Sequence, residues 1–445
     1  MFKKLLPLVA AFPLLLVAFC GLTLAALYGC DDQSISTQLR QGFRQGVLPN
    51  IEHATSAYGH DDHEYDVFSE CVGLGLNLGN VDQSWLYRLA ASPYVGPQDS
   101  SQPATAGKGA PCHDLDRAVA SGRAEAGLPY FRFWHGYQIY IRAVLSLASV
   151  AMLHKLNAVL LFGSLIYLAY VFSRRFGPGA FAALLVPLAL ATDILSAPPI
   201  TVHSISLSWC FFSAALVAHM RDKSPRLTAN IRMAVFCSGA IFNFLSMLFN
   251  PPLAPALMAF TMLAYSSPEE QPPRKWAGEI DALETVGLWF LGFGLTWIAK
   301  WLLAVVVLDP STVAASLSSA AQGEHYDAFH NAQVHTPFAP TLVTLFWSAN
   351  LPLTILASWF ATLLILAKQF GRTASSALNL RGFFRLQLPL LIVVAWSETF
   401  RVHSVEHAGY VMRNLVLFAI LPLLAALLVT RRGPGPEKAE GNPKS

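Results

Sequence analysis

The sequence predicts an all-α polytopic membrane protein with about ten transmembrane helices and a long outer loop after the first helix. Of its 445 residues, 54% are hydrophobic and only 13% are charged, whereas a typical soluble protein has about 25% charged residues. The apolar residues gather in runs long enough to cross a bilayer, which takes about 20 residues of helix. The net charge of +3 is too small to suggest nucleic-acid binding. A soluble enzyme, a disordered chain and a small disulfide framework are therefore excluded.

The apolar runs can be followed from one end of the chain to the other, as one transmembrane domain over residues 1–445. The fifth and sixth runs meet at Asn250, Pro251 and Pro252, where two consecutive prolines break the helix and indicate a tight hairpin. The sixth run is short for a membrane span. The predicted spans are residues 5–28, 154–173, 178–197, 203–220, 232–249, 253–266, 284–308, 342–368, 386–400 and 413–430.

Lys and Arg residues in the short loops predict the orientation. With a cytoplasmic N-terminus, basic pairs such as Arg174 and Arg175 fall on the cytoplasmic side. The short outer loops then carry little beyond Arg401 and Arg413. Ten spans return the chain to the cytoplasm, so residues 431–445 are predicted to form a cytoplasmic tail.

Residues 29–153 form a long outer loop in this topology, and long loops cross the membrane regardless of their charge. The last part of this loop, residues 134–153, is apolar but carries His135 and Arg142. We expect it to lie as a helix at the membrane interface, because counting it as a span would invert every later loop.

Titratable residues are distributed unevenly between the two sides of the membrane in the predicted topology. Twelve of the 13 histidines fall on the outer side, and only His219 lies near the cytoplasmic face. Ionisable residues are nearly absent from helix centres, with Lys300 as the main exception, because a charge at the bilayer centre costs about 3 kcal/mol. This distribution predicts a polar site that opens outward. It disfavours a transporter, in which ionisable residues and broken helices usually lie at the midplane.

Three features follow one another in the first half of the chain. They are the acidic pair directly after the first span, a basic and aromatic stretch late in the outer loop, and a span that ends in basic residues: Cys30-Asp31-Asp32, Arg132-Phe133-Trp134-His135-Gly136-Tyr137, and Leu156 to Arg174-Arg175-Phe176-Gly177. Over residues 1 to about 220 this layout resembles the GT-C superfamily of integral membrane glycosyltransferases. The acidic pair is often Asp-Glu in that family and is Asp-Asp here. Within the family, length and layout are similar to the bacterial enzymes that attach arabinofuranose to type IV pilins.

The resemblance implies a glycosyltransferase of the bacterial inner membrane whose active site faces the periplasm. Its donor would be a polyprenyl-phosphate-linked sugar such as D-arabinofuranose, and its acceptor a pilin or a surface glycan. An inverting transfer needs a base for the acceptor hydroxyl and cations for the leaving phosphate. Asp31 and Asp32 are the expected bases, with Asp31 favoured by its place directly after the helix; a solvated helix boundary is the alternative. The alternative functions are an O-antigen ligase or polymerase and a flippase or exporter of lipid-linked sugars.

Other residues of the outer loop are candidates as well. Residues 65–78 are predicted to be helical, which would bring Asp66 and Glu70 onto one face as alternative catalytic carboxylates. The neighbouring acidic cluster is expected to bind the acceptor or to form a solvated loop: His60, Asp61, Asp62 and His63. A divalent cation is compatible with these ligand types, but no known metal-ligand spacing is met, so no metal ligand is assigned.

The donor phosphate is expected to bind in the last outer loop, because Arg can hold a phosphate bidentately and His titrates near neutrality. The candidates are Arg401, His403, His407 and Arg413, with a structural salt-bridge network as the alternative. Lys300 is expected to pair with Asp193 or with a phosphate, or else to extend to the membrane interface.

Two further expectations concern the outer loop. Arg132, Trp134 and His135 are predicted to contact the carrier or the sugar, with interfacial anchoring as the alternative. Cys30, Cys71 and Cys112 lie in an oxidising compartment in this topology. Cys71 is predicted to pair with Cys112, because Cys30 is tied to the membrane surface.

Overall fold

The computed structural model describes residues 2–48, 63–78, 83–95, 110–121, 129–224, 227–266, 276–311 with 313–314, 336–370 and 380–431. In this part of the chain the fold is helical, with one isolated β-bridge between Leu76 and Tyr94. Seven of the predicted spans coincide with helices that are long and apolar enough to cross a membrane. The prediction of an all-α polytopic membrane protein is thus confirmed.

The seven candidate membrane spans are built from nine helices, because two spans consist of two helices each. They are α1 (Phe2–Gly29), α7 (Val150–Phe176), α9 (Thr201–Lys223), α12 (Ala277–Val307), α16 (Asn350–Phe370), α17 (Leu380–Arg385) with α18 (Leu390–Thr399), and α20 (Ala408–Leu415) with α21 (Leu417–Arg431). The other three predicted spans coincide with apolar helices of 13 to 17 residues: α8 (Gly179–Ala191), α10 (Ala229–Leu245) and α11 (Leu253–Tyr265).

The predicted span at residues 342–368 is divided in the structure. Its first part belongs to the separate helix α15 (Ala339–Phe346), and α16 begins only at Asn350. The Ser348 hydroxyl accepts a hydrogen bond from the backbone N–H of Asn350 at 3.3 Å. Such a local side-chain bond competes with a continuous helix, and it lies at the point where the apolar run divides into two helices.

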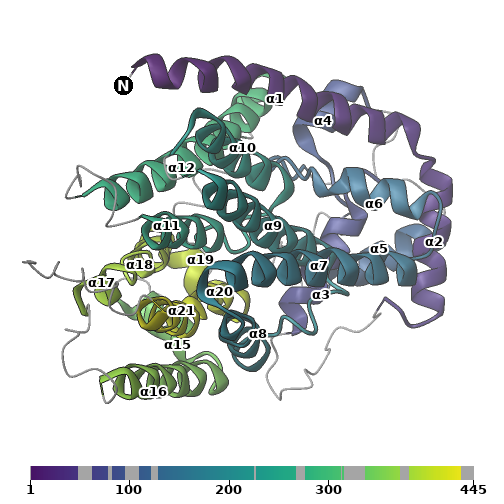
Figure 1. Ribbon diagram of the computed structural model, residues 1–445. Coiled ribbons are helices and arrows are strands. Elements are labelled where there is room, and N and C mark those ends of the chain that lie inside the picture. The colour runs from purple at the N-terminus through teal and green to yellow at the C-terminus, as the bar shows by residue number, and fades with distance from the viewer. Residues whose placement is uncertain are drawn as a thin grey trace, which may run out of the picture.

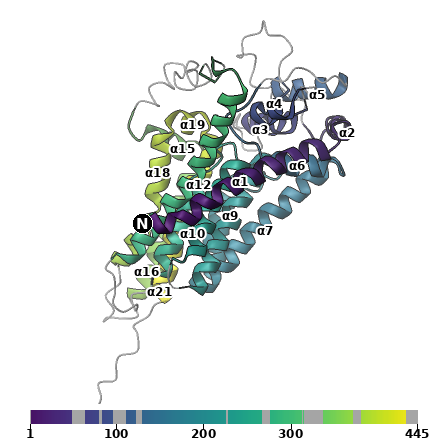
Figure 2. The ribbon, with the colours of Figure 1, turned by 90° about the horizontal axis from the view of Figure 1, so that it is seen from above.

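Residues from the predicted outer loop form helices that gather at one end of the bundle (Figure 2), which we call the outer end. The same end carries α15 and α19 (Arg401–Glu406), whereas α16 and α21 extend toward the opposite end. The helices from the loop are α2 (Asp32–Arg44), α3 (His63–Gly75), α4 (Trp85–Ala91), α5 (Ala110–Ser121) and α6 (Tyr137–Leu145).

The predicted interfacial helix corresponds to α6, which is shorter than expected. It covers nine residues, and a turn over residues 146–149 separates it from α7. Gln138 and Arg142 of α6 are buried, and Figure 1 shows α6 between α1 and α7. The helix is therefore packed among its neighbours, because its polar side chains find partners there.

Helices α10 and α12 approach each other closely enough for their backbones to touch. A Cβ atom added at Gly239 of α10 would lie 2.0 Å from the carbonyl oxygen of Trp289. A Cβ atom added at Gly292 of α12 would lie 2.1 Å from the carbonyl oxygen of Phe236. Glycine is thus required on both sides of the crossing, as in other membrane helix pairs that pack backbone to backbone.

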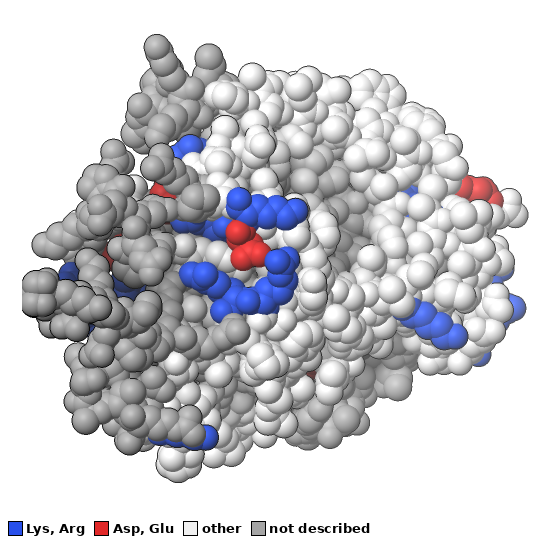
Figure 3. All heavy atoms as spheres, in the orientation of Figure 1, with Lys and Arg blue, Asp and Glu red and all other residues white. Residues whose placement is uncertain are grey.

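The end of the bundle opposite the outer end is tied together by ion pairs. The first turns of α12 carry three carboxylates, and each pairs with an arginine from a different helix. The pairs are Glu279 with Arg385 of α17 at 2.6 Å, Asp281 with Arg221 of α9 at 3.7 Å, and Glu284 with Arg232 of α10 at 2.6 Å. Figure 3 shows Lys and Arg gathered around acidic side chains in one group near α9, while most of the other described surface in this view carries neither.

Candidate functional site

The acidic pair lies where α1 ends and α2 begins. Asp31 is the N-cap of α2, and its carboxylate accepts hydrogen bonds from the backbone N–H groups of Gln33 at 3.2 Å and Ser34 at 2.9 Å. It also accepts a 2.6 Å bond from the Ser34 hydroxyl. These bonds lower the pKa of the exposed Asp31 carboxyl, and the bond from the Ser34 hydroxyl has the largest effect. A lower pKa makes Asp31 a weaker proton acceptor.

Asp32 faces two arginines from other outer helices. Its carboxylate forms an ion pair with the Nη2 atom of Arg142 in α6, and the Nη2 atom of Arg88 in α4 lies 3.7 Å away. The side chains of Arg142 and Arg88 are only 3% and 9% exposed, whereas that of Asp32 is 30% exposed. We refer to these three residues as the Asp32 cluster. It contains two buried cations and one partly exposed anion.

Both arginines of the Asp32 cluster also donate hydrogen bonds to backbone carbonyl oxygens. The Nε atom of Arg142 donates to the carbonyl oxygen of Ala26 in α1 at 3.0 Å, and the Nη2 atom of Arg88 donates to the carbonyl oxygen of Asn77 at 2.8 Å. Other N–H groups are unused: Nη1 of Arg142 and Nε of Arg88 are buried without a hydrogen-bond partner in the described part of the chain. Burial lowers the pKa of Arg88 and Asp32 opposes this effect.

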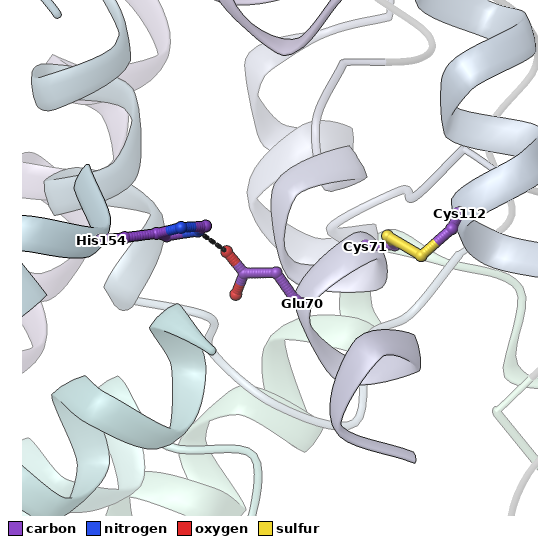
Figure 4. Close-up of a disulfide and its surroundings, with 4 residues drawn as sticks. All are labelled: Glu70, Cys71, Cys112 and His154. Carbon is purple, nitrogen blue, oxygen red and sulfur yellow. Dashed lines mark ion pairs between the residues drawn. A yellow bond between two sulfur atoms is a disulfide. The ribbon is translucent and has the colours of Figure 1, made fainter. Parts of the chain in front are cut away.

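Glu70 is committed to a structural contact. It is 3% exposed, and its carboxylate accepts hydrogen bonds from the backbone N–H of Thr201 at 2.5 Å and from the Thr201 hydroxyl at 2.8 Å. Thr201 is the first residue of α9, so Glu70 supplies the cap that this helix lacks in its own sequence. Figure 4 shows Glu70 pointing toward His154 of α7, 3.5 Å away. Asp66 belongs to α3, but its side chain lies outside the described residues.

The predicted disulfide between Cys71 and Cys112 is confirmed, and it joins α3 to α5. It lies on the side of α3 that faces away from His154 (Figure 4). The Nε atom of Arg40 in α2 donates to the carbonyl oxygen of Val119 near the end of α5 at 2.7 Å. Helices α2, α3 and α5 are therefore linked to one another, and Glu70 links them to α9.

The predicted phosphate ligands of the last outer loop lie in a network of ion pairs. Arg413 is 1% exposed, and its guanidinium pairs with Asp193 at 2.6 Å and contacts Nδ1 of His203 at 2.8 Å. Arg401 pairs with Glu398 at 2.8 Å. This is the salt-bridge arrangement that the sequence left open as an alternative.

The two remaining members of that set are aromatic neighbours. The ring centroids of His403 and His407 are 4.8 Å apart, and His407 stacks on Tyr410 at 4.9 Å. Burial lowers the pKa of His407 to about 4, so its imidazole is neutral at pH 7. A role in phosphate binding stays a prediction for both histidines.

Lys300 contacts the outer helices instead of Asp193, which is held by Arg413. Its Nζ atom donates to the carbonyl oxygen of Leu89 at 2.7 Å and to the Ser92 hydroxyl at 3.1 Å. These groups lie at the end of α4, where carbonyl oxygens lack helical partners and favour a cation. The ammonium also lies 5.5 Å from the centre of the Trp134 ring.

Trp134 and His135 are part of the core. Trp134 is 4% exposed, and its Nε1 atom donates to the carbonyl oxygen of Thr296 at 2.8 Å. The Nε2 atom of His135 contacts the carbonyl oxygen of Tyr130 at 2.8 Å, and Nδ1 contacts the Tyr137 hydroxyl at 3.0 Å. Burial, with a smaller effect of Lys300, lowers the pKa of His135 to about 3. Neither side chain is placed to stack on a sugar in this conformation.

The remaining candidates are less defined. Arg132 is half-buried, and its carbonyl oxygen accepts a hydrogen bond from Nε1 of Trp297 at 3.0 Å. His60, Asp61 and Asp62 lie outside the described residues, and of His63 only the backbone, at the start of α3, is described. Within the described ranges no group of three or more His, Cys, Asp or Glu side chains is arranged to hold a metal ion.

Arg88 and Arg142 were not predicted as site residues, although the sequence shows Arg142 as a charge within the apolar stretch 134–153. Both stand within apolar stretches of the outer loop, Trp85–Ala91 and Tyr137–Leu145. A charge inside an apolar helix needs a partner, and this signal could have identified them. No family model, curated protein or solved structure matches the chain.

Proposed function

We propose that this chain is a membrane glycosyltransferase that takes a sugar from a polyprenyl-phosphate carrier and transfers it to an acceptor hydroxyl at the outer end of the bundle. The observation that supports it best is the placement of Asp32. This carboxylate lies at the end of the first membrane helix, is partly exposed, and is held by two buried arginines. Of the three predicted carboxylates whose side chains the structure describes, Asp31 and Glu70 are occupied as helix caps, so Asp32 is the preferred base.

The proposed reaction has simple requirements. The acceptor oxygen attacks the anomeric carbon of the donor sugar, and the bond from that carbon to the carrier phosphate breaks. The phosphate leaves with the bonding electron pair, and the proton of the acceptor hydroxyl passes to Asp32. A positioned base contributes about 10²- to 10⁴-fold to the rate of such a step.

The outer end is proposed to face the periplasm, with both termini in the cytoplasm. Two independent observations support this orientation. Four basic residues beside the short loops that the structure describes lie at the opposite end of the bundle, as the positive-inside rule requires: Arg174, Arg221, Arg232 and Arg385. The disulfide lies among the outer helices, and such bonds persist in oxidising compartments.

The proposal is tested by sugar transfer in proteoliposomes. The full chain is reconstituted with a panel of polyprenyl-phosphate sugars, starting with the arabinofuranosyl donor, and with pilin or glycan acceptors. Asp32→Asn is expected to lose at least about 100-fold in transfer rate. Asp31→Ser is the matched control, because serine also caps a helix, and it is expected to retain activity.

The same assay can reject the proposal. If no donor yields transfer while labelled carrier crosses the bilayer with the parent and with Asp32→Asn, the chain is a flippase. If Asp31→Ser abolishes transfer while Asp32→Asn does not, Asp31 is the base.

A further inference from the structure

We propose that Arg88 and Arg142 form a binding site for a phosphate-type oxyanion, and that Asp32 occupies this site until the anion displaces it. The binding of the anion does not depend on the proposed function. The consequence for catalysis, that displacement frees Asp32 to act as a base, rests on the proposed function.

The first argument is the balance of charge. Two guanidinium groups are at least nine-tenths buried, and they share one carboxylate that is itself 30% exposed. A buried charge without a full counter-charge is strongly unfavourable. The Asp32 cluster therefore carries one positive charge more than its own residues neutralise, which favours an added anion.

The second argument is the supply of donors. Nη1 of Arg142 and Nε of Arg88 are buried N–H groups without a partner among the described residues. A guanidinium presents its N–H groups in a planar fork that matches the oxygens of a phosphate. A tetrahedral oxyanion has more acceptor positions than the single carboxylate of Asp32, so it can satisfy donors that Asp32 leaves unused.

The third argument is that the site persists when Asp32 leaves. Arg142 is fixed by its bond to Ala26, and Arg88 by its bond to Asn77. Neither bond involves Asp32. Asp32 is the first residue of α2 and its side chain is partly exposed to solvent. A change of its χ1 angle can therefore move the carboxylate away from the two arginines, while the cap at Asp31 keeps the backbone in place.

The position limits the source of the anion. The cluster lies at the outer end of α1, near Tyr28, a residue that is 70% exposed. A phosphate there can come from the headgroup of a lipid in the outer leaflet or from free phosphate in solution. Both sources offer the same chemistry, and they are separated by the experiment.

The experiment measures the thermal unfolding midpoint of the full chain in nanodiscs of phosphatidylcholine. In one arm inorganic phosphate is titrated, and in the other the nanodiscs contain increasing fractions of undecaprenyl phosphate. Anion binding to the folded protein raises the midpoint. Stabilisation in the first arm indicates a free anion, and stabilisation in the second arm alone indicates a lipid headgroup.

Variants test the displacement. Asp32→Asn removes the competing carboxylate, so the apparent affinity for the anion should rise about tenfold or more, which corresponds to 1.4 kcal/mol or more. Asp31→Asn is the matched control: it removes the same charge one residue away and keeps a good cap, so the affinity should change by less than about twofold. Arg142→Lys and Arg88→Lys keep the charge but lose the fork, and each should weaken binding about tenfold.

The proposal is overturned if neither arm stabilises the parent or Asp32→Asn, or if Asp32→Asn binds the anion no more tightly than Asp31→Asn. Its fate is separable from that of the proposed function. Tighter binding by Asp32→Asn together with an absence of transfer from every donor supports the anion site and rejects the transferase. Transfer that depends on Asp32 without any change in anion affinity gives the opposite result.

Discussion

Replacing Gly292 by alanine is expected to push α10 and α12 apart. The new Cβ atom would lie 2.1 Å from the carbonyl oxygen of Phe236, and the nearest atoms are all backbone atoms that cannot rotate away. Forcing extra atoms into a packed core costs about 3 kcal/mol at the upper end of the usual range. Alanine regains about 1 kcal/mol because it favours helix over glycine. The expected net loss in the free energy of unfolding is about 2 kcal/mol.

The same helix offers a matched control. Gly294 lies two residues further along α12, and a Cβ atom added there meets nothing within 4 Å. Gly294→Ala is therefore expected to leave stability unchanged or to raise it by up to about 1 kcal/mol. The assay is equilibrium unfolding of the purified chain in mixed micelles with increasing SDS, followed by tryptophan fluorescence.

A second variant sharpens the test. Gly239→Ala places its Cβ atom 2.0 Å from the carbonyl oxygen of Trp289, at the same crossing. Once one alanine has separated the two helices, the second should cost less, so the double variant should lose less stability than the sum of the single ones. Equal shifts for Gly292→Ala and Gly294→Ala would refute the reasoning, as would additive losses at positions 239 and 292.

Three further outcomes follow from the outer helices. Burial lowers the pKa of His135 to about 3 in the folded protein, while the pKa of an unfolded histidine is about 6.5. The stability that neutral His135 contributes is therefore fully present above about pH 6.5 and is lost as the pH falls toward 3. His135→Gln should flatten this decline, as measured by unfolding midpoints from pH 7 to 4. Cys112→Ser opens a loop between cysteines 41 positions apart and should cost about 2–4 kcal/mol, seen as faster hydrogen exchange in α3 and α5, whereas Cys237→Ser, at a free cysteine, should not change it. Glu70→Ala leaves the buried N–H of Thr201 unpaired and should cost about 1–3 kcal/mol; Glu70→Gln, which keeps one accepting oxygen, should cost less, and equal losses in thermal unfolding would contradict the capping role.

The sequence predicted the class of the fold because bilayer thickness imposes a length on apolar runs. Pattern alone could not show that one such run divides near Ser348, since most residues around this position are apolar and only a local side-chain bond lies at the break. It also could not separate an exposed histidine from a buried one. His203 is buried against Arg413, which lies 210 positions along the chain, and His135 has a left-handed backbone, with φ 57°, and contacts the Tyr137 hydroxyl.

The candidate site was predicted in part. The acidic pair was found because it follows the first span directly, and Cys71 was paired correctly with Cys112. Which of the two aspartates is free to react depends on partners that come from α4 and α6, more than 50 and 100 positions along the chain. Such pairings arise from tertiary packing, which no local pattern encodes.

Helix α3 is joined to α5 by the disulfide and to α9 by Glu70, and these two links have a consequence for how the chain assembles. Translation proceeds from the N-terminus, and domains tend to form in that order. Cys71 and Cys112 are both made well before Thr201, which lies 131 residues beyond its partner Glu70. The disulfide can thus close before α9 is synthesised.

When α9 then enters the bilayer, the Glu70 carboxylate is already present to accept hydrogen bonds from its first residue. The unpaired N–H groups at the start of a helix cannot remain unsatisfied in lipid. We therefore expect Glu70 to fix where α9 begins relative to the outer helices, which would be folded before the later membrane helices pack against them.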